Sequence, residues 1–464
     1  MSVALNELTL REAIDGIRAK QFSAAEVQQA VIATVIKKNP ELNVYRDFHE
    51  TATDENFAED LAGVPIAVKD NILTPGLKTT ASSAVLTEYM PHYEATLAKQ
   101  IREAGAFVVG KTNLDAWAHG SSTETSAFGP TKNPLNPEYI PGGSSGGSAA
   151  AIAADMAIAA IGTETSGSIL GPSAWCGMVG LKPTYGRVSR YGVIAMASSL
   201  DCPGPMTKTV EDAAIMLEYM AGQDKYDGTT SPTEVPGYRD FIGKDIKGLR
   251  IGVMYLDILD SDEQRAVYET AKEELRALGA IVEDVQAMNP EPAIGMYAVL
   301  QRSEVSSNLA RFDGIRYGEG RDAFGEEAKR RIMLGTYTLS KGYAEKYYIQ
   351  AQRVRSLFIQ DFTRLFAEYD VLVSPTMPGY ALKLGESKNF AFFGEMVDKM
   401  AEPRAAAGLP AVNVPCHRDP ATNLSLGLAF TAPAFQEQLA IQVADAYERA
   451  TNWNPWRKRQ QEGA

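Results

Sequence analysis

Residues 141–170 read PGGSSGGSAAAIAADMAIAAIGTETSGSIL, and no other segment says more about how this chain folds. This stretch contains two clusters of Gly and Ser, GGSSGGS at 142–148 and GTETSGS at 162–168, with Ala, Ile and Met between them. A flexible linker is rich in Gly and Ser but carries no apolar insert that packs as a helix. The pattern therefore predicts two serine-bearing loops that a helix of small residues holds a fixed distance apart.

The overall composition is that of an ordinary globular protein, with 464 residues of which 45% are hydrophobic and 22% charged. The formal net charge of −13 repels a phosphate backbone, so we expect contact with RNA only through a partner. The three cysteines form no C-x-x-C pair, which indicates free thiols in a reducing compartment. They are Cys176, Cys202 and Cys416.

The N-terminal stretch MSVALNELTLREAIDGIRAK (1–20) lacks the basic start, apolar core and cleavage site of a signal peptide. Nowhere do 18 apolar residues run together. We therefore expect a cytoplasmic protein with no membrane contact.

Short β-rich runs alternate with helical patterns along the chain, which predicts an α/β fold with parallel strand pairs. Ser23 and Glu26 form a capping box that begins a helix, and Asn39-Pro40 is expected to end it. The segment 223–247 is rich in Gly, Pro and Asp, but the same element types lie on both sides of it. We expect one domain over 1–464, with the helical segment 1–40 packed on it and a surface excursion near 223–247.

Several common catalytic and binding motifs match this sequence only in part. GSSGG (143–147) matches the G-x-S-x-G elbow with Ser145 at its centre, but a Pro-rich loop precedes it where the elbow needs a strand. GGSSGGSAAA lacks the Lys-Ser/Thr of a phosphate-binding P-loop. The four histidines have no zinc spacing, so no metal site is expected. Only His119, in WAHGSSTE, lies in a polar loop, and a surface or hydrogen-bonded structural role is the simpler interpretation; the others are His49, His92 and His417.

The remaining candidate base is Lys69, at the end of the apolar run GVPIAVKDN (63–71). A lysine that ends a β-run is ordinarily solvated. If its amine is buried instead, desolvation lowers its pKa from about 10.4 toward neutrality, and the neutral amine becomes able to activate a hydroxyl. Serine chemistry without histidine then becomes possible.

GVPIAVKDN, PGGSSGGSAAA and GTETSGSI, in this order and at this spacing, resemble the amidase signature family. That family uses a Ser–Ser–Lys triad, and the motif positions make Ser168 the nucleophile, Ser144 the bridging serine and Lys69 the base. The resemblance also implies a cis peptide bond at the bridging serine and a large mixed sheet covered by helices on both faces. The tight turn Thr165-Ser166-Gly167 is the candidate oxyanion hole because it directs several backbone N–H groups at one point.

Further segments resemble one branch of that family, the A subunits of the glutamyl-tRNA(Gln)/aspartyl-tRNA(Asn) amidotransferases. They include 101–137, VGLKPTYGRVSRYGVIAMASSLD (179–201), AKRRIMLGTYTLSKGY (328–343) and AGLPAVNVPC (407–416). This resemblance implies release of ammonia from glutamine, companion subunits B and C, and no cofactor in this chain. ATP and magnesium are expected at the partner, and tRNA is expected to bind only there.

The same branch assigns glutamine binding to the positions of Tyr297, Arg331 and Asp398 in this sequence. A guanidinium and a carboxylate are the complementary pair for the α-carboxylate and α-ammonium of free glutamine. The resemblance thus supplies a substrate site in addition to the triad.

This chain departs from the family where GTETSGSIL replaces the usual G-S-D-T-G-G-S-I-R, so that Ser166 stands for a glycine and Leu170 for an arginine. A positive φ at position 166 would strain a serine by about 1–2 kcal/mol. Such departures resemble stand-alone amidases that hydrolyse a small carboxylic amide, which is the alternative function. A family-fold scaffold without activity is a third hypothesis, and the sequence leaves the tRNA acceptor open.

Overall fold

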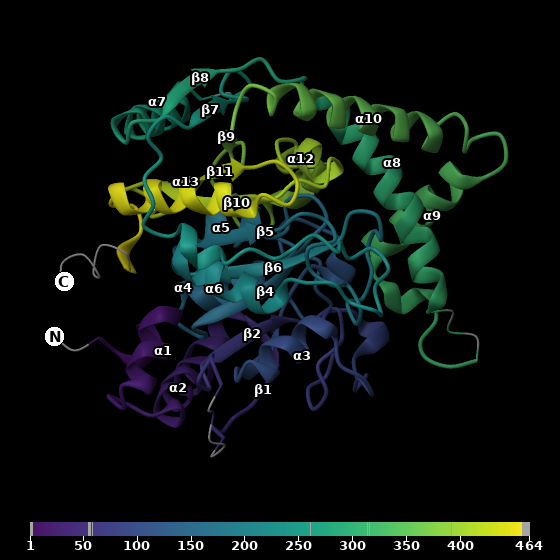
Figure 1. Ribbon diagram of the computed structural model, residues 1–464. Helices are drawn as coiled ribbons and strands as arrows, with labels where there is room; N and C mark the ends of the chain where they lie inside the picture. The colour runs from purple at the N-terminus through teal and green to yellow at the C-terminus, as the bar shows by residue number, and fades with distance from the viewer. Residues whose placement is uncertain are drawn as a thin grey trace.

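In the computed structural model, residues 3–53, 57, 59–259, 261–312, 314, 316–390 and 392–456 are described. Their strands form an 11-stranded sheet in the order β1-β3-β2-β4-β6-β5-β10-β11-β9-β7-β8 (Figure 1). The expected α/β fold with a large mixed sheet is confirmed. The strands are β1 (Tyr45–Phe48), β2 (Pro65–Lys69), β3 (Phe107–Thr112), β4 (Ala159–Glu164), β5 (Val179–Lys182), β6 (Cys202–Thr207), β7 (Arg250–Val253), β8 (Ile281–Asp284), β9 (Val371–Pro375), β10 (Ala411–Arg418) and β11 (Ser425–Thr431).

The α-helices come between and after these strands. They are α1 (Leu10–Arg18), α2 (Ala24–Leu42), α3 (Thr96–Glu103), α4 (Gly146–Ala153), α5 (Leu170–Trp175), α6 (Val210–Met220), α7 (Asp262–Ala277), α8 (Glu291–Asn308), α9 (Glu326–Leu339), α10 (Tyr348–Leu365), α11 (Phe393–Val397), α12 (Glu402–Ala406) and α13 (Glu437–Ala450). Short 3-10 helices occur at Leu5–Glu7, Ala84–Leu86, Ala116–Ala118, Tyr238–Phe241, Leu309–Arg311, Arg321–Phe324 and Glu386–Asn389. Within the described residues, none of the helices is long and apolar enough to span a membrane.

The strand directions place the two serine loops and Lys69 at one edge of the sheet. β2 runs parallel to both β3 and β4, with Val68 beside Ile161. Because parallel strands end at the same edge, Lys69 at the end of β2 lies near the turn that follows β4. β4 then pairs antiparallel with β6, and the second parallel group, β9-β7-β8, lies at the far end of the sheet.

Helices cover both faces of the sheet, as β11 illustrates. A Cβ on Gly427 would lie 2.7 Å from Ala174 of α5, whereas the Phe430 ring packs on Tyr447 of α13 with centroids 5.7 Å apart. Side chains three positions apart on a strand point to opposite faces, so α5 and α13 lie on opposite sides. Figure 1 also shows α8, α9 and α10 extending to one side of the sheet.

The expected capping box is confirmed, because the Ser23 side chain accepts from the Glu26 backbone N–H while Glu26 reaches the Ser23 N–H. The expected end at Asn39-Pro40 is wrong, since α2 continues through Pro40 to Leu42. Proline removes one N–H from the last turn, and the helix ends two residues later at Leu42, followed by the C-cap Asn43 in the left-handed conformation (φ 51°).

The expected small-residue helix occupies only the first part of the interval between the serine loops. α4 ends at Ala153, and the second apolar run, Ala159–Glu164, is strand β4, buried along its whole length. A short, fully buried apolar run carries no period that separates strand from helix. The helix and the strand together set the distance between the loops.

Candidate active site

Lys69 is buried at the end of β2, and its Nζ lies among three oxygens. The distances are 2.8 Å to Ser144 Oγ, 2.7 Å to Ser145 Oγ and 3.1 Å to the Thr163 carbonyl. Ser144 and Ser145 precede α4, whereas Thr163 belongs to β4. Lys69 therefore joins the first serine loop to the strand that leads into the second.

The electrostatic surroundings of Lys69 favour the neutral amine. Burial lowers the pKa of Lys69 to about 7, although the carboxylates of Asp115, Asp201 and Glu164 act in the opposite direction. An amine with this pKa is substantially unprotonated at neutral pH, and its lone pair is available to a neighbouring hydroxyl proton. Of the two possibilities that the sequence leaves open for this lysine, a solvated strand end and a buried amine, the structure shows the buried amine.

The first serine loop packs against the strand end through glycine. A Cβ on Gly147 would lie 2.3 Å from the Asn113 carbonyl, which accepts from the Gly147 N–H at 3.1 Å. Only glycine permits this approach. The peptide bond between Gly143 and Ser144 is cis, as the family resemblance implies.

The second serine loop, after β4, carries Ser168. Its carbonyl accepts from the Ser145 N–H at 3.2 Å, so the two loops are in direct backbone contact. Among the described residues no hydrogen bond joins Ser144 Oγ to Ser168 Oγ. Catalytic hydrogen bonds of this kind commonly tighten only when substrate is bound.

The turn between β4 and Ser168 exposes backbone donors. Within the described chain, nothing accepts from the N–H groups of Thr165, Ser166 and Gly167. Glu164 accepts from Ile169 N at 2.8 Å, which fixes the far side of the turn. Ser166 does not adopt a positive φ, so the strain considered for a serine at this position does not arise.

Three residues far apart in the sequence line one small cavity with Ser166 and Ser168: Tyr297 of α8, Arg331 of α9 and Asp398, which follows α11. The structure therefore brings together every residue for which the sequence predicts glutamine binding. Their roles stay a prediction, but their position beside Ser168 agrees with it.

Asp398 lies directly over the second serine loop. A Cβ on Gly167 would be 2.4 Å from Asp398 Oδ1, so the family's glycine is required here. Asp398 Oδ2 accepts from Ser121 Oγ at 2.9 Å and from Ser166 Oγ at 3.0 Å, whereas Oδ1 has no partner among the described residues. Burial raises the pKa of Asp398 to about 7, and the two hydroxyl donors oppose that rise.

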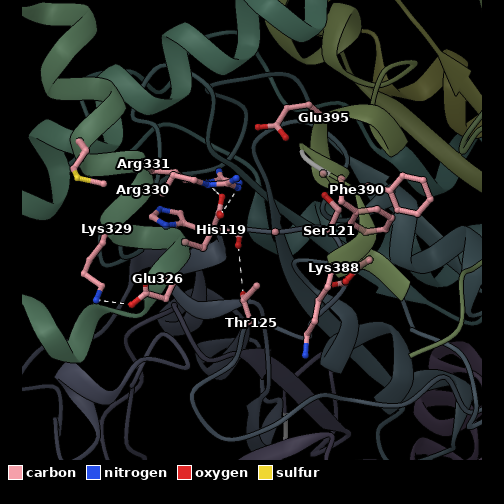
Figure 2. Close-up of a pocket in the computed structure, with 17 residues that line it drawn as sticks. His119, Ser121, Thr125, Glu326, Lys329, Arg330, Arg331, Lys388, Phe390 and Glu395 are labelled. Carbon is pink, nitrogen blue, oxygen red and sulfur yellow. Dashed lines mark hydrogen bonds and ion pairs between the residues drawn. The ribbon is translucent and has the colours of Figure 1, made fainter. Parts of the chain in front are cut away.

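Arg331 lies where this small cavity meets a larger one of about 790 Å³ (Figure 2). Its Nε donates to Glu327 Oε1 at 2.6 Å, and within the described residues its two terminal nitrogens have no acceptor. A guanidinium held by one edge presents its remaining N–H groups to a carboxylate. Beside it, Arg302 and Glu395 form a buried ion pair at 2.6 Å.

Two residues of the site are not identified by sequence reasoning. Ser145 fails as an elbow nucleophile, yet it contacts Lys69 as closely as Ser144 does. Its position next to Ser144 in GSSGG is the signal that could have found it. His119 is neither at the surface nor hydrogen-bonded through its ring, because it is fully buried and both ring nitrogens lack a partner in the described chain. The simpler interpretation of this histidine is therefore wrong.

The potential metal ligands of the described ranges are dispersed. No group of three or more His, Cys, Asp or Glu side chains in those ranges is arranged to hold a metal ion. The three cysteines are free and buried, as their number and spacing predict: Cys176, Cys202 and Cys416.

Comparison with known proteins agrees with the geometry. The Amidase family model matches residues 23–441. The A subunit of glutamyl-tRNA(Gln) amidotransferase from Halothermothrix orenii is 44% identical over 97% of this chain and 98% of its own. The crystal structure of the same subunit from Thermotoga maritima superposes with a TM-score of 0.86 at 38% identity, covering 97% of this chain and 96% of that one. Peptide amidase from Stenotrophomonas maltophilia is similar at 29% identity and a TM-score of 0.82, covering 96% and 97%. A buried lysine between two serine loops, on a matching fold and sequence over nearly the whole chain, leads to one conclusion: the chain belongs to the amidase signature family.

Proposed function

We propose that this chain is the glutamine-hydrolysing component, the A subunit, of a tRNA-dependent amidotransferase. The observation that carries the chemistry is the contact of buried Lys69 Nζ with Ser144 Oγ at 2.8 Å, beside the loop that bears Ser168. The similarity to the A subunits of the Halothermothrix and Thermotoga enzymes supports the substrate and the biological role.

The reaction begins with two proton transfers. Neutral Lys69 takes a proton from Ser144, Ser144 takes one from Ser168, and Ser168 Oγ attacks the carboxamide carbon of glutamine. The N–H groups of Thr165, Ser166 and Gly167 stabilise the oxyanion of the tetrahedral intermediate. The relay then returns a proton to the leaving nitrogen, ammonia departs, and water hydrolyses the γ-glutamyl ester on Ser168.

Substrate binding follows from the charges around Ser168. Arg331 pairs with the α-carboxylate, and the free oxygen of Asp398 accepts from the α-ammonium. Tyr297 closes the same small cavity. Burial brings the pKa of both Lys69 and Asp398 to about 7. Lowering the pH below that value therefore protonates the Lys69 amine, and it also protonates the Asp398 carboxylate that binds the α-ammonium.

The partner proposal follows from the same similarity. Companion subunits B and C form a complex with this chain in the cytoplasm, and the ammonia amidates Glu-tRNA(Gln) at the partner, which binds tRNA, ATP and magnesium. The formal charge of −13 agrees with a chain that leaves tRNA to its partner. We further propose that residues 1–464 form a single amidase-type domain that needs no cofactor of its own.

A stand-alone amidase for a small carboxylic amide is the second candidate. The observation that favours it is the departure at Ser166 and Leu170. Ser166 Oγ donates to Asp398, so the serine at position 166 has a hydrogen-bond partner. Leu170 is fully buried at the start of α5, so an apolar side chain suits position 170 in this chain.

Replacing Ser168 by Ala removes the nucleophile, and we expect the loss of acyl-enzyme together with a fall in kcat of about 10⁴-fold or more. Lys69→Ala is expected to be comparably severe because the triad acts as a unit. Ser173→Ala is the matched control, since Ser173 is a buried serine of α5 whose hydroxyl has no partner in the described chain. Turnover near the wild-type rate in Ser168→Ala would end the mechanism.

Arg331→Ala is expected to lower kcat/KM for glutamine about 10- to 150-fold. This range corresponds to roughly 1.5–3 kcal/mol for a hydrogen bond to a charged group. Hydrolysis of propionamide, which has no α-carboxylate, is expected to change little. Arg353→Ala, an exposed arginine of α10, is the control. Equal losses for both substrates would indicate a folding defect, and no loss for glutamine would remove Arg331 from the site.

Purification of the native protein from its own cells separates the two candidate functions. The amidotransferase proposal predicts that two companion subunits co-elute with this chain, and that the complex forms Gln-tRNA(Gln) from Glu-tRNA(Gln), glutamine and ATP. An active monomer or homodimer, with glutamine a poorer substrate than simple amides, would favour the stand-alone amidase.

A further inference from the structure

His119 is held by a loop whose backbone is unusual. It follows the 3-10 helix Ala116–Ala118, in which Trp117 (φ 61°) and Ala118 (φ 63°) adopt the left-handed conformation. Residues with a Cβ disfavour this conformation, and such strain concentrates at functional sites. Asp115 fixes the loop by accepting from the Thr123 N–H at 2.8 Å.

The imidazole of His119 has no partner of its own. The residue is fully buried, yet in the described chain neither ring nitrogen has a hydrogen-bond partner. Buried polar groups in folded proteins are almost always paired, so an unpaired one calls for an explanation. His119 lines the larger cavity together with Arg331, whose charge acts on its ring (Figure 2).

The groups around His119 determine the protonation state of its imidazole ring. Burial lowers the pKa of His119 well below its usual value, and the charges of Arg331 and Arg302 lower it further. A neutral imidazole offers one N–H donor and one acceptor nitrogen. Since cations surround the ring, the group that it meets in this part of the cavity is expected to be an anionic acceptor.

We propose that His119 is a specificity-determining residue whose ring N–H donates to the α-carboxylate of glutamine, beside Arg331. The inference rests on the proposed function, because it takes the amino-acid substrate from there. Arg331 has free terminal N–H groups within the described residues and supplies the charge, whereas His119 supplies a directional donor that a simple amide does not use. Neither the family motifs nor the triad assign a role to this residue.

The test uses the full chain, purified with any companion subunits that co-elute, and three substrates. These are L-glutamine, glutaramate, which lacks the α-amino group, and 4-aminobutanamide, which lacks the α-carboxylate. The variants are His119→Phe, which removes both ring nitrogens, and His119→Gln, which restores an N–H donor. His417→Phe is the control, since that ring packs on Trp453 and lines neither cavity.

We expect His119→Phe to lower kcat/KM about 10-fold or more for glutamine and glutaramate, with a much smaller effect on 4-aminobutanamide. His119→Gln is expected to recover part of the loss, and His417→Phe to behave as wild type. Equal losses for all three substrates, or no loss for any, would overturn the inference. If wild-type protein hydrolyses no glutamine, the proposed function fails as well, whereas normal glutamine hydrolysis with an unchanged substrate ratio in His119→Phe defeats only the role of His119.

A second measurement needs no His119 variant. In Ser168→Ala protein with ¹⁵N-labelled histidine, glutaramate is expected to shift the ring ¹⁵N signals of His119, whereas 4-aminobutanamide leaves them in place. Identical responses to the two ligands, or none to either, would contradict the proposed contact.

Discussion

The contact of Lys69 Nζ with two serine hydroxyls is the interaction on which the rest of the site depends. The amine reaches both because β2 and β4 end at one edge of the sheet, and the first serine loop is tied to the loop after β4 there by the Ser145 N–H, which donates to the Ser168 carbonyl. Burying an ammonium ion at that position is costly, and the neutral amine avoids the cost. In the proposed mechanism, the fold thus provides a base at neutral pH without a histidine, by excluding water from a lysine.

Burial also shifts the pKa of Asp398, but it raises the pKa of this acid where it lowers the pKa of Lys69. Asp398 is also buried, and hydroxyl donors from Ser121 and Ser166 offset part of the cost of its charge. Its remaining oxygen lies over Gly167, in the loop that carries Ser168. In the proposed function, this carboxylate connects recognition of the substrate to the loop that carries Ser168. Ser166, where this chain departs from its family, takes part in that connection through its hydrogen bond to Asp398.

Local chemistry explains what could be predicted from the sequence. The capping box at Ser23, the α/β alternation and the two serine loops are short-range signals, and the lysine and serine motifs identified the family. Strand β4 was missed because a fully buried run has no diagnostic period. The end of α2 was missed because a single lost hydrogen bond at Pro40 does not terminate a helix that packing supports. The environments of His119 and Asp398 depend on contacts between distant segments; Ser121 and Asp398, for example, are 277 residues apart. No local sequence pattern predicts such contacts.

Burial makes Lys69 a neutral base in the proposed mechanism, and titration of this lysine measures whether it does. Protein labelled with ¹³Cε-lysine would be followed by NMR from pH 5 to pH 11, and the Lys69→Arg variant would identify the signal. We expect a midpoint near pH 7, far below that of the surface lysines, because burial lowers the pKa of Lys69 to about 7. A midpoint near the ordinary lysine value of about 10.4 would mean that the amine is protonated at neutral pH, and would contradict the mechanism.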